Sequence, residues 1–403
     1  MIPAHYQFDT FHGKRIHLGV TGSIAAYKAL DLTRALLHLH LQVGATLTES
    51  ARNFVTELSF AALGADPLYT DMFAGAANFD HLEPSVADVF IVAPATANIV
   101  AKMAHGIADD LLSCQLLAYP GPILVAPAMN PRMWNAPATR DNWNILGQRG
   151  VVRIEPECGS VACGDTGQGR LASLDEIFIR TLAALSPQDL RSKKIMLTLG
   201  PTREYFDKAR FWSNPSTGIM GACLAVAAAL RGAEVTAITG PVDVALPSMI
   251  KRVPVVTARE MFEAAADIFP AQDIGCFTAA VADFRPPACP TGKYKKGGEP
   301  LSLTFEPNPD ILATLSSEKK SWQRTIGFAA ESQDLESNAH NKLQRKNLDL
   351  IIANPIDEPG AGFASPTNRV VVMDRHGRQE SWPQLPKTEV AWRIWDWISM
   401  NTP

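Results

Sequence analysis

The sequence predicts an α/β protein made of two Rossmann-like three-layer domains. Short apolar runs alternate with helix-like segments along almost the whole chain of 403 residues. Near-continuous apolar strands separated by helices are typical of a parallel sheet that is covered on both faces. The alternation restarts with a fresh first strand at 194–199, and a chain of this length is comfortable for two domains of about 200 residues each.

The expected elements follow one another in a regular order in each half. In the first half, we expect strands at 15–20, 43–48, 89–93, 122–126 and 151–154, with an amphipathic helix at 25–40 after the first. In the second half, we expect a helix at 219–231 and strands at 194–199, 234–238, 274–279, 325–329, 349–353 and 369–373. The segment between them, LSPQDLRSKK, is polar and contains a proline. We therefore expect domains at 1–184 and 195–403, joined by a linker at 185–194.

The overall charge and the hydropathy pattern argue against nucleic acids and membranes as partners. The formal net charge of −4 provides no basic field of the kind that duplex binding requires. The local cluster KYKK (293–296) suits a small anion better. No apolar run approaches the ~20 residues that cross a bilayer, and segment 1–15 lacks the apolar core of a secretory signal. We expect a cytoplasmic protein whose six cysteines are free thiols.

Three loops with hydroxyl side chains follow expected strands in the first half. The segment GVTGSIAAYK (19–28) runs from a strand through a glycine-containing turn into a helix, and TESA (48–51) and APATAN (93–98) follow two other strands. A helix N-terminus with hydroxyls nearby is a ready anion site, although a plain tight turn is the alternative for the first loop. Because ligands of open α/β sheets bind at the carboxyl ends of strands, the three loops together favour a phosphate-bearing ligand. The dinucleotide pattern G-x-G-x-x-G is absent.

Three further residues could carry chemistry. Asn130 in APAMN could hold a carboxylate through its amide nitrogen, or it could be a turn residue before a proline. His81 in FDHLEP is suited to proton transfer near neutral pH, or it could be an ordinary loop residue. Cys163 lies in the glycine-rich stretch ACGDTGQGR (162–170) and could be a bridge partner, a metal ligand, a core residue or a catalytic acid. Cys158 adds too few ligands for a zinc site.

Five of these features, in this order and spacing, resemble the homo-oligomeric flavin-containing cysteine decarboxylases over residues 14–180, and among them the phosphopantothenoylcysteine decarboxylases. They are GVTGSIAAYK, His81, APATAN, APAMN and ACGDTGQGR. The resemblance implies the fold of that family, 4′-phosphopantothenoylcysteine as substrate, and bound FMN that oxidises the substrate thiol so that CO2 can leave. His81 would be the base or orienting group, Asn130 the carboxylate ligand and Cys163 the proton donor. The FMN contacts implied are Gly22, Ser23, Ile24, Thr48, Ser50, Pro94, Ala95, Thr96 and Ser113.

The second half combines cations, carboxylates and a helix start. The segment 200–221 contains Arg203, Arg210, Asn214 and an STG turn (216–218) that opens a helix, which can clamp a phosphate or a carboxylate. The alternative is a solvated loop. Asp283 and Asp310, with lysines at 293, 342 and 346, could hold a nucleoside triphosphate and its Mg2+. No G-x-x-x-x-G-K-[ST] is present, which excludes a P-loop.

These segments resemble phosphopantothenate–cysteine ligases over residues 190–395, and the fused order matches the bacterial bifunctional family of coenzyme A biosynthesis. The resemblance implies that CTP activates 4′-phosphopantothenate as an acyl-CMP with release of pyrophosphate, and that cysteine then displaces CMP. Asn214 and Arg210 would contact the acyl adduct, and Lys293 would stabilise charge. The CTP contacts implied are Asp283, Asn308, Pro309, Asp310, Ile311, Phe328, Lys342 and Lys346, with Mg2+ at Asp283 and Asp310.

The resemblance also implies a homo-oligomer with trimeric decarboxylase units joined by ligase dimers. One position departs from the family pattern: Ile219 in STGIMG stands where a lysine is common, so we expect an effect on substrate-phosphate affinity or on ligase rate. The choice between CTP and ATP stays open. A flavoprotein regulatory subunit that binds phosphatases is the alternative function, but the chain carries no acidic tail and has His81, Asn130 and Cys163 together.

Overall fold

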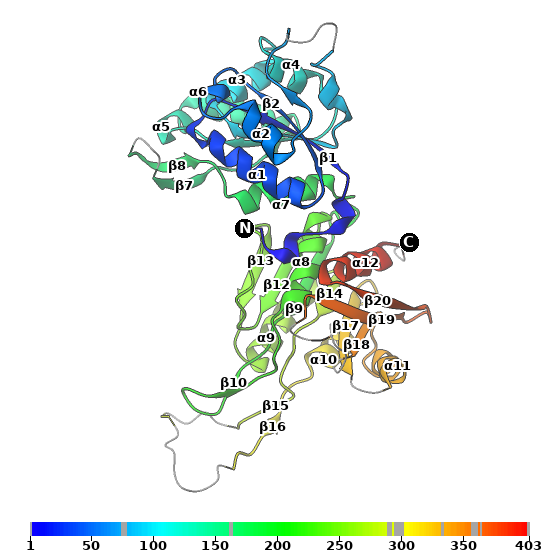
Figure 1. The fold of residues 1–403 in the computed structure, drawn as a ribbon. Helices are drawn as coiled ribbons and strands as arrows, with labels where there is room; N and C mark the ends of the chain where they lie inside the picture. The colour runs from blue at the N-terminus through cyan, green and yellow to red at the C-terminus, as the bar shows by residue number, and fades with distance from the viewer. Residues whose placement is uncertain are drawn as a thin grey trace. The chain divides into compact units, whose positions relative to one another are not determined.

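The computed structural model describes residues 2–73, 79–160, 164–287, 292–293, 302–331, 334–355, 362 and 365–400. The chain folds into two compact units (Figure 1). Residues Asp9–Pro187 form the first unit, and Gln188–Pro403 with the N-terminal segment Pro3–Phe8 form the second. In the second unit, the ring of Phe8 lies 5.6 Å from the ring of Trp392. Within the described ranges, none of the helices has both the length and the apolar character that a bilayer-spanning helix needs.

A parallel sheet forms the centre of the first unit. Its six strands, as far as the structure describes the unit, lie in the order β3 (Leu68–Tyr69), β2 (Gln42–Leu47), β1 (Arg15–Val20), β4 (Val89–Ala95), β5 (Ile123–Pro127) and β6 (Val152–Arg153). Every residue of the central strand β4 is buried, because helices cover both faces of the sheet. An antiparallel hairpin of β7 (Glu157–Ser160) and β8 (Thr166–Arg170) follows β6.

The helices of the first unit form the two outer layers. Helices α1 and α7 contact each other and β4. Helices α3, α4 and α6 pack around a cluster of buried apolar residues that includes Trp134 and Trp143. The helices are α1 (Tyr27–His38), α2 (Glu57–Leu63), α3 (Ala97–His105), α4 (Leu111–Ala118), α5 (Pro131–Trp134), α6 (Pro137–Gln148) and α7 (Leu174–Leu185). This is the three-layer α/β fold that the alternation of strands and helices predicts.

The second unit has a larger sheet of the same kind. In its described part, eight strands lie in the order β13 (Ile250–Pro254), β12 (Glu234–Thr239), β9 (Lys194–Leu199), β14 (Ile274–Phe277), β17 (Arg324–Glu331), β18 (Leu350–Pro355), β19 (Thr367–Asp374) and β20 (Gln379–Pro386). Neighbours pair in parallel from β13 to β18, and β19 and β20 add an antiparallel edge. The first residues of β19 and the end of β20 therefore lie at the carboxyl edge of the parallel strands.

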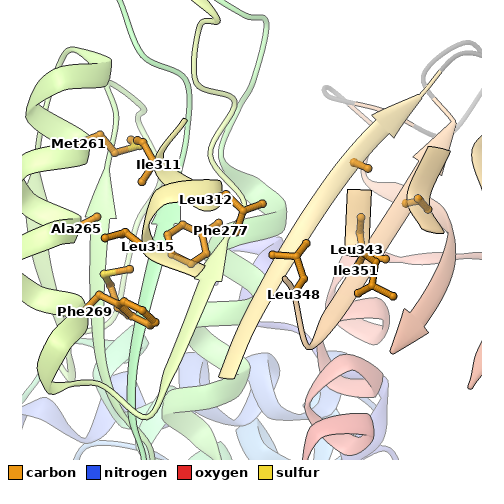
Figure 2. Packing of buried hydrophobic residues seen from close by; sticks show 14 of the residues in the cluster. Met261, Ala265, Phe269, Phe277, Ile311, Leu312, Leu315, Leu343, Leu348 and Ile351 are labelled. Carbon is orange, nitrogen blue, oxygen red and sulfur yellow. The ribbon is translucent and has the colours of Figure 1, made fainter. Parts of the chain in front are cut away.

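Different helices cover the two faces of this sheet. Helices α8 (Ile219–Leu230) and α12 (Lys387–Met400) pack against each other, and the indole of Trp395 donates to the carbonyl of Leu224 at 2.9 Å. The other face carries α9 (Ala258–Ile268), α10 (Ile311–Glu318) and α11 (Leu335–Arg345). Figure 2 shows their side chains packed with Phe277 and Ile351 of the sheet. Right-handed crossovers require this separation, because the chain moves in opposite directions along the sheet through α8 and through α9–α11.

Two pairs of short strands extend from the carboxyl edge. They are β10 (Glu204–Tyr205) with β11 (Phe211–Trp212), and β15 (Phe284–Arg285) with β16 (Glu306–Pro307). The sequence pattern does not predict these pairs, nor the edge strands β13 and β20. Edge strands lie half in solvent and here carry mostly exposed residues, so they lack the apolar run that marks a buried strand.

Candidate functional sites

A cavity of about 580 Å³ lies at the carboxyl edge of the sheet in the first unit. Five of the residues expected to contact flavin or substrate line it, and they come from the ends of β1, β4 and β5: Gly22, Ser23, Ile24, Thr96 and Asn130. Met129, Ser160, Gly169 and Arg170 complete part of its wall. The structure thus joins the loop after the first strand, the loop after β4 and the hairpin β7–β8 in one site.

The turn after β1 is held in a fixed shape. The hydroxyl of Thr21 donates to the carbonyl of Pro94 at 2.7 Å and accepts from the backbone N–H of Thr96 at 3.0 Å. A Cβ on Gly22 would lie 2.4 Å from the Cβ of Ser50, so only glycine fits against that segment. Ser23 caps the following turn by accepting from Ala25 N–H at 3.3 Å. The turn is therefore held in a fixed shape at the start of a helical segment, a position that suits the phosphate of a flavin.

The other expected flavin contacts do not line the cavity, as far as the described residues go. Ser113 is buried and forms a capping box with Asp110 at the start of α4. The hydroxyl of Thr48 accepts from Ala51 N–H at 3.2 Å, and Ser50 packs behind Gly22. Pro94 and Ala95 lie at the end of β4. The backbone carbonyl of Pro94 helps to fix the turn after β1, because it accepts the hydrogen bond from the Thr21 hydroxyl.

Two hydrogen bonds hold the side chain of Asn130 in one orientation, and a third holds its partner Asp165. Its Oδ1 accepts from the backbone N–H of Arg132 at 2.8 Å, and its Nδ2 donates to Oδ2 of Asp165 at 2.7 Å. The other carboxylate oxygen of Asp165 accepts from the Arg132 guanidinium at 3.0 Å. The sequence reasoning missed Asp165, although it lies two residues after Cys163 in the same stretch.

Gly169 allows the hairpin to approach Asn130. Its carbonyl accepts from Met129 N–H at 2.9 Å, and a Cβ at Gly169 would lie 2.4 Å from the Met129 carbonyl oxygen. Cys163 itself lies outside the described residues. The hairpin that flanks it is nevertheless fastened to the end of β5, where the expected carboxylate ligand stands.

In the described part of the chain, His81 is not among the residues that line the cavity. Hydrogen bonds from buried side chains hold the residue that precedes it. The carbonyl of the preceding Asp80 accepts from Gln115 Nε2 at 2.9 Å, and Gln115 Oε1 accepts from the Thr46 hydroxyl at 2.6 Å. The Thr46 hydroxyl lies 2.7 Å from Nε2 of the buried His17. A chain of buried polar groups therefore runs from β1 to the residue before His81.

A second cavity, of about 530 Å³, lies at the carboxyl edge of the sheet in the second unit. It brings together residues that are distant in the sequence, from the ends of β9, β14, β17 and β18 and the starts of α8, α10 and α12. Nine of the expected ligase residues line it: Asn214, Asp283, Asn308, Pro309, Asp310, Ile311, Phe328, Lys342 and Lys346. The departing residue Ile219 lines it as well.

Two lysines and a carboxylate lie together on one side of this cavity. Asp310 caps α10 by accepting from Ala313 N–H at 3.0 Å and pairs with the Lys346 ammonium at 2.7 Å. Burial opposes ionisation of Asp310, but the hydrogen bonds from Lys346 and Ala313 outweigh it and lower the pKa of the carboxyl. Burial, and then the neighbouring Lys346 charge, lowers the pKa of Lys342, whose Nζ donates to the Phe328 carbonyl at 3.1 Å. In the described parts of the chain, no group of three or more metal-binding side chains forms a cage.

Asparagines position the loops around the cavity. Nδ2 of Asn214 lies 3.3 Å from the carbonyl of Ala280 and 3.2 Å from that of Val281. Nδ2 of Asn308 donates to the Ala282 carbonyl at 2.8 Å. Both amides thus bond to the loop that ends in Asp283 and hold it beside the start of α8.

Two expected ligase residues lie elsewhere within the described residues. Arg210 pairs with the buried Asp207 at 3.1 Å in the β10–β11 extension, and Lys293 is exposed. Neither lines the cavity. Conversely, Asn354, Asn368 and Lys387 line it without having been singled out, because each stands alone in an ordinary strand or helix start.

Comparison with known proteins gives matches over both units. The family model "Flavoprotein" matches residues 8–186, and the model "DNA/pantothenate metabolism flavoprotein C-terminal domain" matches residues 190–401. The coenzyme A biosynthesis bifunctional protein CoaBC of Bacillus subtilis is 42% identical over 390 residues, covering 95% of this chain and 96% of that protein. The protein of the same name from Escherichia coli K12 is 42% identical over 398 residues, covering 94% and 97%.

Solved structures match each unit separately. The C-terminal domain of a coenzyme A biosynthesis bifunctional protein CoaBC is 36% identical, with a TM-score of 0.46, and covers 53% of this chain and 97% of that one. A mutant PPC decarboxylase complexed with pantothenoylaminoethenethiol is 33% identical, with a TM-score of 0.40, and covers 42% of this chain and 97% of that one.

Proposed function

This chain belongs to the family of the bifunctional coenzyme A biosynthesis proteins CoaBC, and on that premise we propose that each of the two cavities is the active site of one reaction. The chain is a bifunctional enzyme with a decarboxylase and a ligase activity, and it is a flavoprotein that uses FMN. A purely regulatory flavoprotein subunit is thereby set aside.

The ligase reaction takes place in the cavity of the second unit. The carboxylate of 4′-phosphopantothenate attacks the α-phosphorus of CTP, and the bond to pyrophosphate breaks. The cysteine amine then attacks the acyl carbon, CMP leaves, and the amine loses a proton. The observation that carries this assignment is the convergence of nine expected residues on one cavity. Lys342 and Lys346 would hold the triphosphate, and Asn214 would lie against the acyl adduct.

Mg2+ would enter this site together with the triphosphate. Mg2+ is commonly bound by one or two carboxylates plus substrate phosphates rather than by a cage of protein ligands. Asp283 and Asp310 both line the cavity and would supply those carboxylates. Arg210 and Lys293 stay in the proposal as residues for the acyl adduct and for charge stabilisation, although the cavity wall does not include them.

The decarboxylation takes place in the cavity of the first unit. FMN fits there because the fixed turn at Gly22 and Ser23, which lines the cavity, stands at the start of a helical segment, a position that suits a phosphate. When bound, FMN supplies reversible two-electron chemistry at the thiol of 4′-phosphopantothenoylcysteine, which activates the neighbouring carboxylate for loss as CO2. Asn130, oriented by Asp165, would hold that carboxylate. Cys163 would protonate the product carbon, with His81 as base or orienting group.

Purified protein with 4′-phosphopantothenate, cysteine, Mg2+ and either CTP or ATP tests the proposal. We expect pyrophosphate and CO2, with faster turnover on CTP. Pyrophosphate without CO2 would overturn the decarboxylase assignment, and absence of both would overturn the whole proposal. A Cys163→Ser variant should release CO2 but not finish 4′-phosphopantetheine; a normal yield of that product would remove the proton-donor role.

The assembly is part of the proposal. We expect a homo-oligomer in which trimeric decarboxylase units are joined by ligase dimers, in the cytoplasm. Light scattering and sedimentation should give a mass that is a multiple of the trimer. A monomer that is fully active would contradict this expectation.

A further inference from the structure

One residue in the wall of the ligase cavity carries a buried acceptor atom without a hydrogen-bond partner. Among the described residues, the buried side-chain N and O atoms with no partner are Trp134 Nε1, Ser316 Oγ and Asn368 Oδ1. Of these three, Asn368 lines the cavity, and the residue is 3% exposed. A buried acceptor without a hydrogen-bond partner destabilises the fold. Such a group in a cavity wall is therefore suited to a ligand that brings a hydrogen-bond donor.

Asn368 lies on the α8–α12 side of the sheet. Val371 and Met373 of the same strand belong to the core under α9–α11. The register shift between Asn368 and Val370 places its extra residue on β20, so β19 keeps the alternation of side chains between the two faces, and Asn368 belongs to the opposite face. It stands at the beginning of β19, beside the end of β20, where it pairs with Leu385.

Lys387 lies next to Asn368 in the topology and on the same side. It is the first residue of α12, immediately after β20, and it is 4% exposed. Its Nζ donates to the carbonyl of Gly362 at 3.1 Å, and its charge acts on Cys223 of α8. Burial lowers the pKa of Lys387. An ammonium with three donors can bond a further acceptor of high charge, and a dianionic phosphate would favour its protonated form.

The cavity consequently has two sides, one on each face of the sheet. Asp310, Lys342 and Lys346 come from the α10–α11 side, whereas Asn368, Lys387 and the turn Ser216–Gly218 come from the α8–α12 side. An in-line attack requires both reactants in the cavity at once. With the nucleotide on the two lysines of the first side, the acid substrate is left with the second side.

We propose that Lys387 and Asn368 form the subsite that binds the acid substrate of the ligase. Lys387 binds its phosphate monoester, and Asn368 Oδ1 accepts from one of its hydroxyl or amide N–H groups. The inference rests on the ligase function proposed above and adds the residues that select the phosphorylated acid. A phosphate dianion has no donor, so the two side chains must recognise different parts of the substrate.

Steady-state kinetics of pyrophosphate release tests the subsite, with 4′-phosphopantothenate and unphosphorylated pantothenate as alternative acids. Lys387→Met should reduce the preference for the phosphorylated acid at least tenfold, the loss of about one charged hydrogen bond. Asn368→Ala should raise KM for both acids by about five- to tenfold. KM for CTP should stay unchanged in both variants.

Ser316→Ala is the matched control. Ser316 carries the same kind of unpartnered buried atom in the same unit, but it lies in α10 and does not line the cavity. This variant should keep both KM values. Asn368→Ala removes an unsatisfied group, so its melting temperature should not fall, and it decides the matter even if Lys387→Met is insoluble.

Different results of this experiment would overturn the ligase function and the subsite. A wild-type protein that forms no pyrophosphate would overturn the ligase function and the subsite with it. An active wild type whose variants show a raised KM for CTP, or an unchanged KM for the acids, would overturn the subsite alone.

Discussion

The Asp165 carboxylate accepts a hydrogen bond from Nδ2 of Asn130 at 2.7 Å, and Asp165 is only partly exposed. This contact, together with the bond from Arg132 N–H to Asn130 Oδ1, fixes the orientation of the Asn130 amide. Asp165→Ala should therefore lower kcat of decarboxylation about 10–100-fold through misplacement of the carboxylate ligand. Asp165→Asn keeps an acceptor oxygen and should recover part of the rate.

Two controls separate positioning from unfolding in this experiment. Ligase activity of the same variants should be unchanged, because Asp165 lies in the other unit. Arg132→Ala should have a smaller effect, because the Arg132 side chain is largely exposed where it meets Asp165. If Asp165→Asn were as slow as Asp165→Ala, the hydrogen bond would not be what Asn130 needs.

Gln115 supports the segment that carries His81. Its amide is 1% exposed and joins the Thr46 hydroxyl to the Asp80 carbonyl. Gln115→Leu removes the hydrogen bonds to the Thr46 hydroxyl and to the Asp80 carbonyl, so we expect a loss of about 1–3 kcal/mol in the free energy of unfolding. Decarboxylation should slow and pyrophosphate release should not. Unchanged decarboxylation in a destabilised variant would show that His81 does not depend on this support.

His17 should make the stability of the first unit depend on pH. It is 3% exposed, and burial lowers its pKa from 6.5 to about 3. Between those two values the unfolded chain binds the proton and the folded chain does not, so stability falls as pH decreases below 6.5. The expected slope is about 1.4 kcal/mol per pH unit. Above pH 6.5, His17 is neutral in both states and contributes no slope.

Urea unfolding followed by flavin absorption, at several pH values between 5 and 7, measures this slope. His17→Asn retains a polar side chain that can bond Thr46 and does not titrate, so its slope over this range should be smaller by about one proton. Equal slopes in the two proteins would contradict the assignment to His17.

Most of the buried strands could be predicted from the sequence, because a buried strand carries a run of apolar residues. The central strands β1, β4, β9 and β14 lie within a few residues of the expected positions. The edge strand β20 and the hairpin β7–β8 could not be predicted. Their residues alternate little between apolar and polar, and the pairing of β7 with β8 is set by long-range contacts and glycine turns.

Site residues that stand in a sequence motif were predicted. Residues that only the folding of the chain brings to the site were missed. Asn130 stands in a motif, whereas its partner Asp165 becomes recognisable only once the hairpin folds back on β5. Lys387 and Asn368 become neighbours of the cavity because β19 and β20 run antiparallel at the sheet edge. No spacing in the sequence could show that topology.

Asp283 and Asp310 should differ in their effect on the Mg2+ requirement of the ligase. The Asp310 carboxylate is already engaged by Lys346 and by the cap of α10, whereas Asp283 is exposed at the cavity. Asp283→Asn should therefore raise the Mg2+ concentration for half-maximal pyrophosphate release about tenfold, the cost of one lost charged contact. Asp310→Asn keeps the helix cap and should act mainly on KM for CTP, because Lys346 loses its counter-charge. A larger Mg2+ effect in Asp310→Asn than in Asp283→Asn would reverse the two roles.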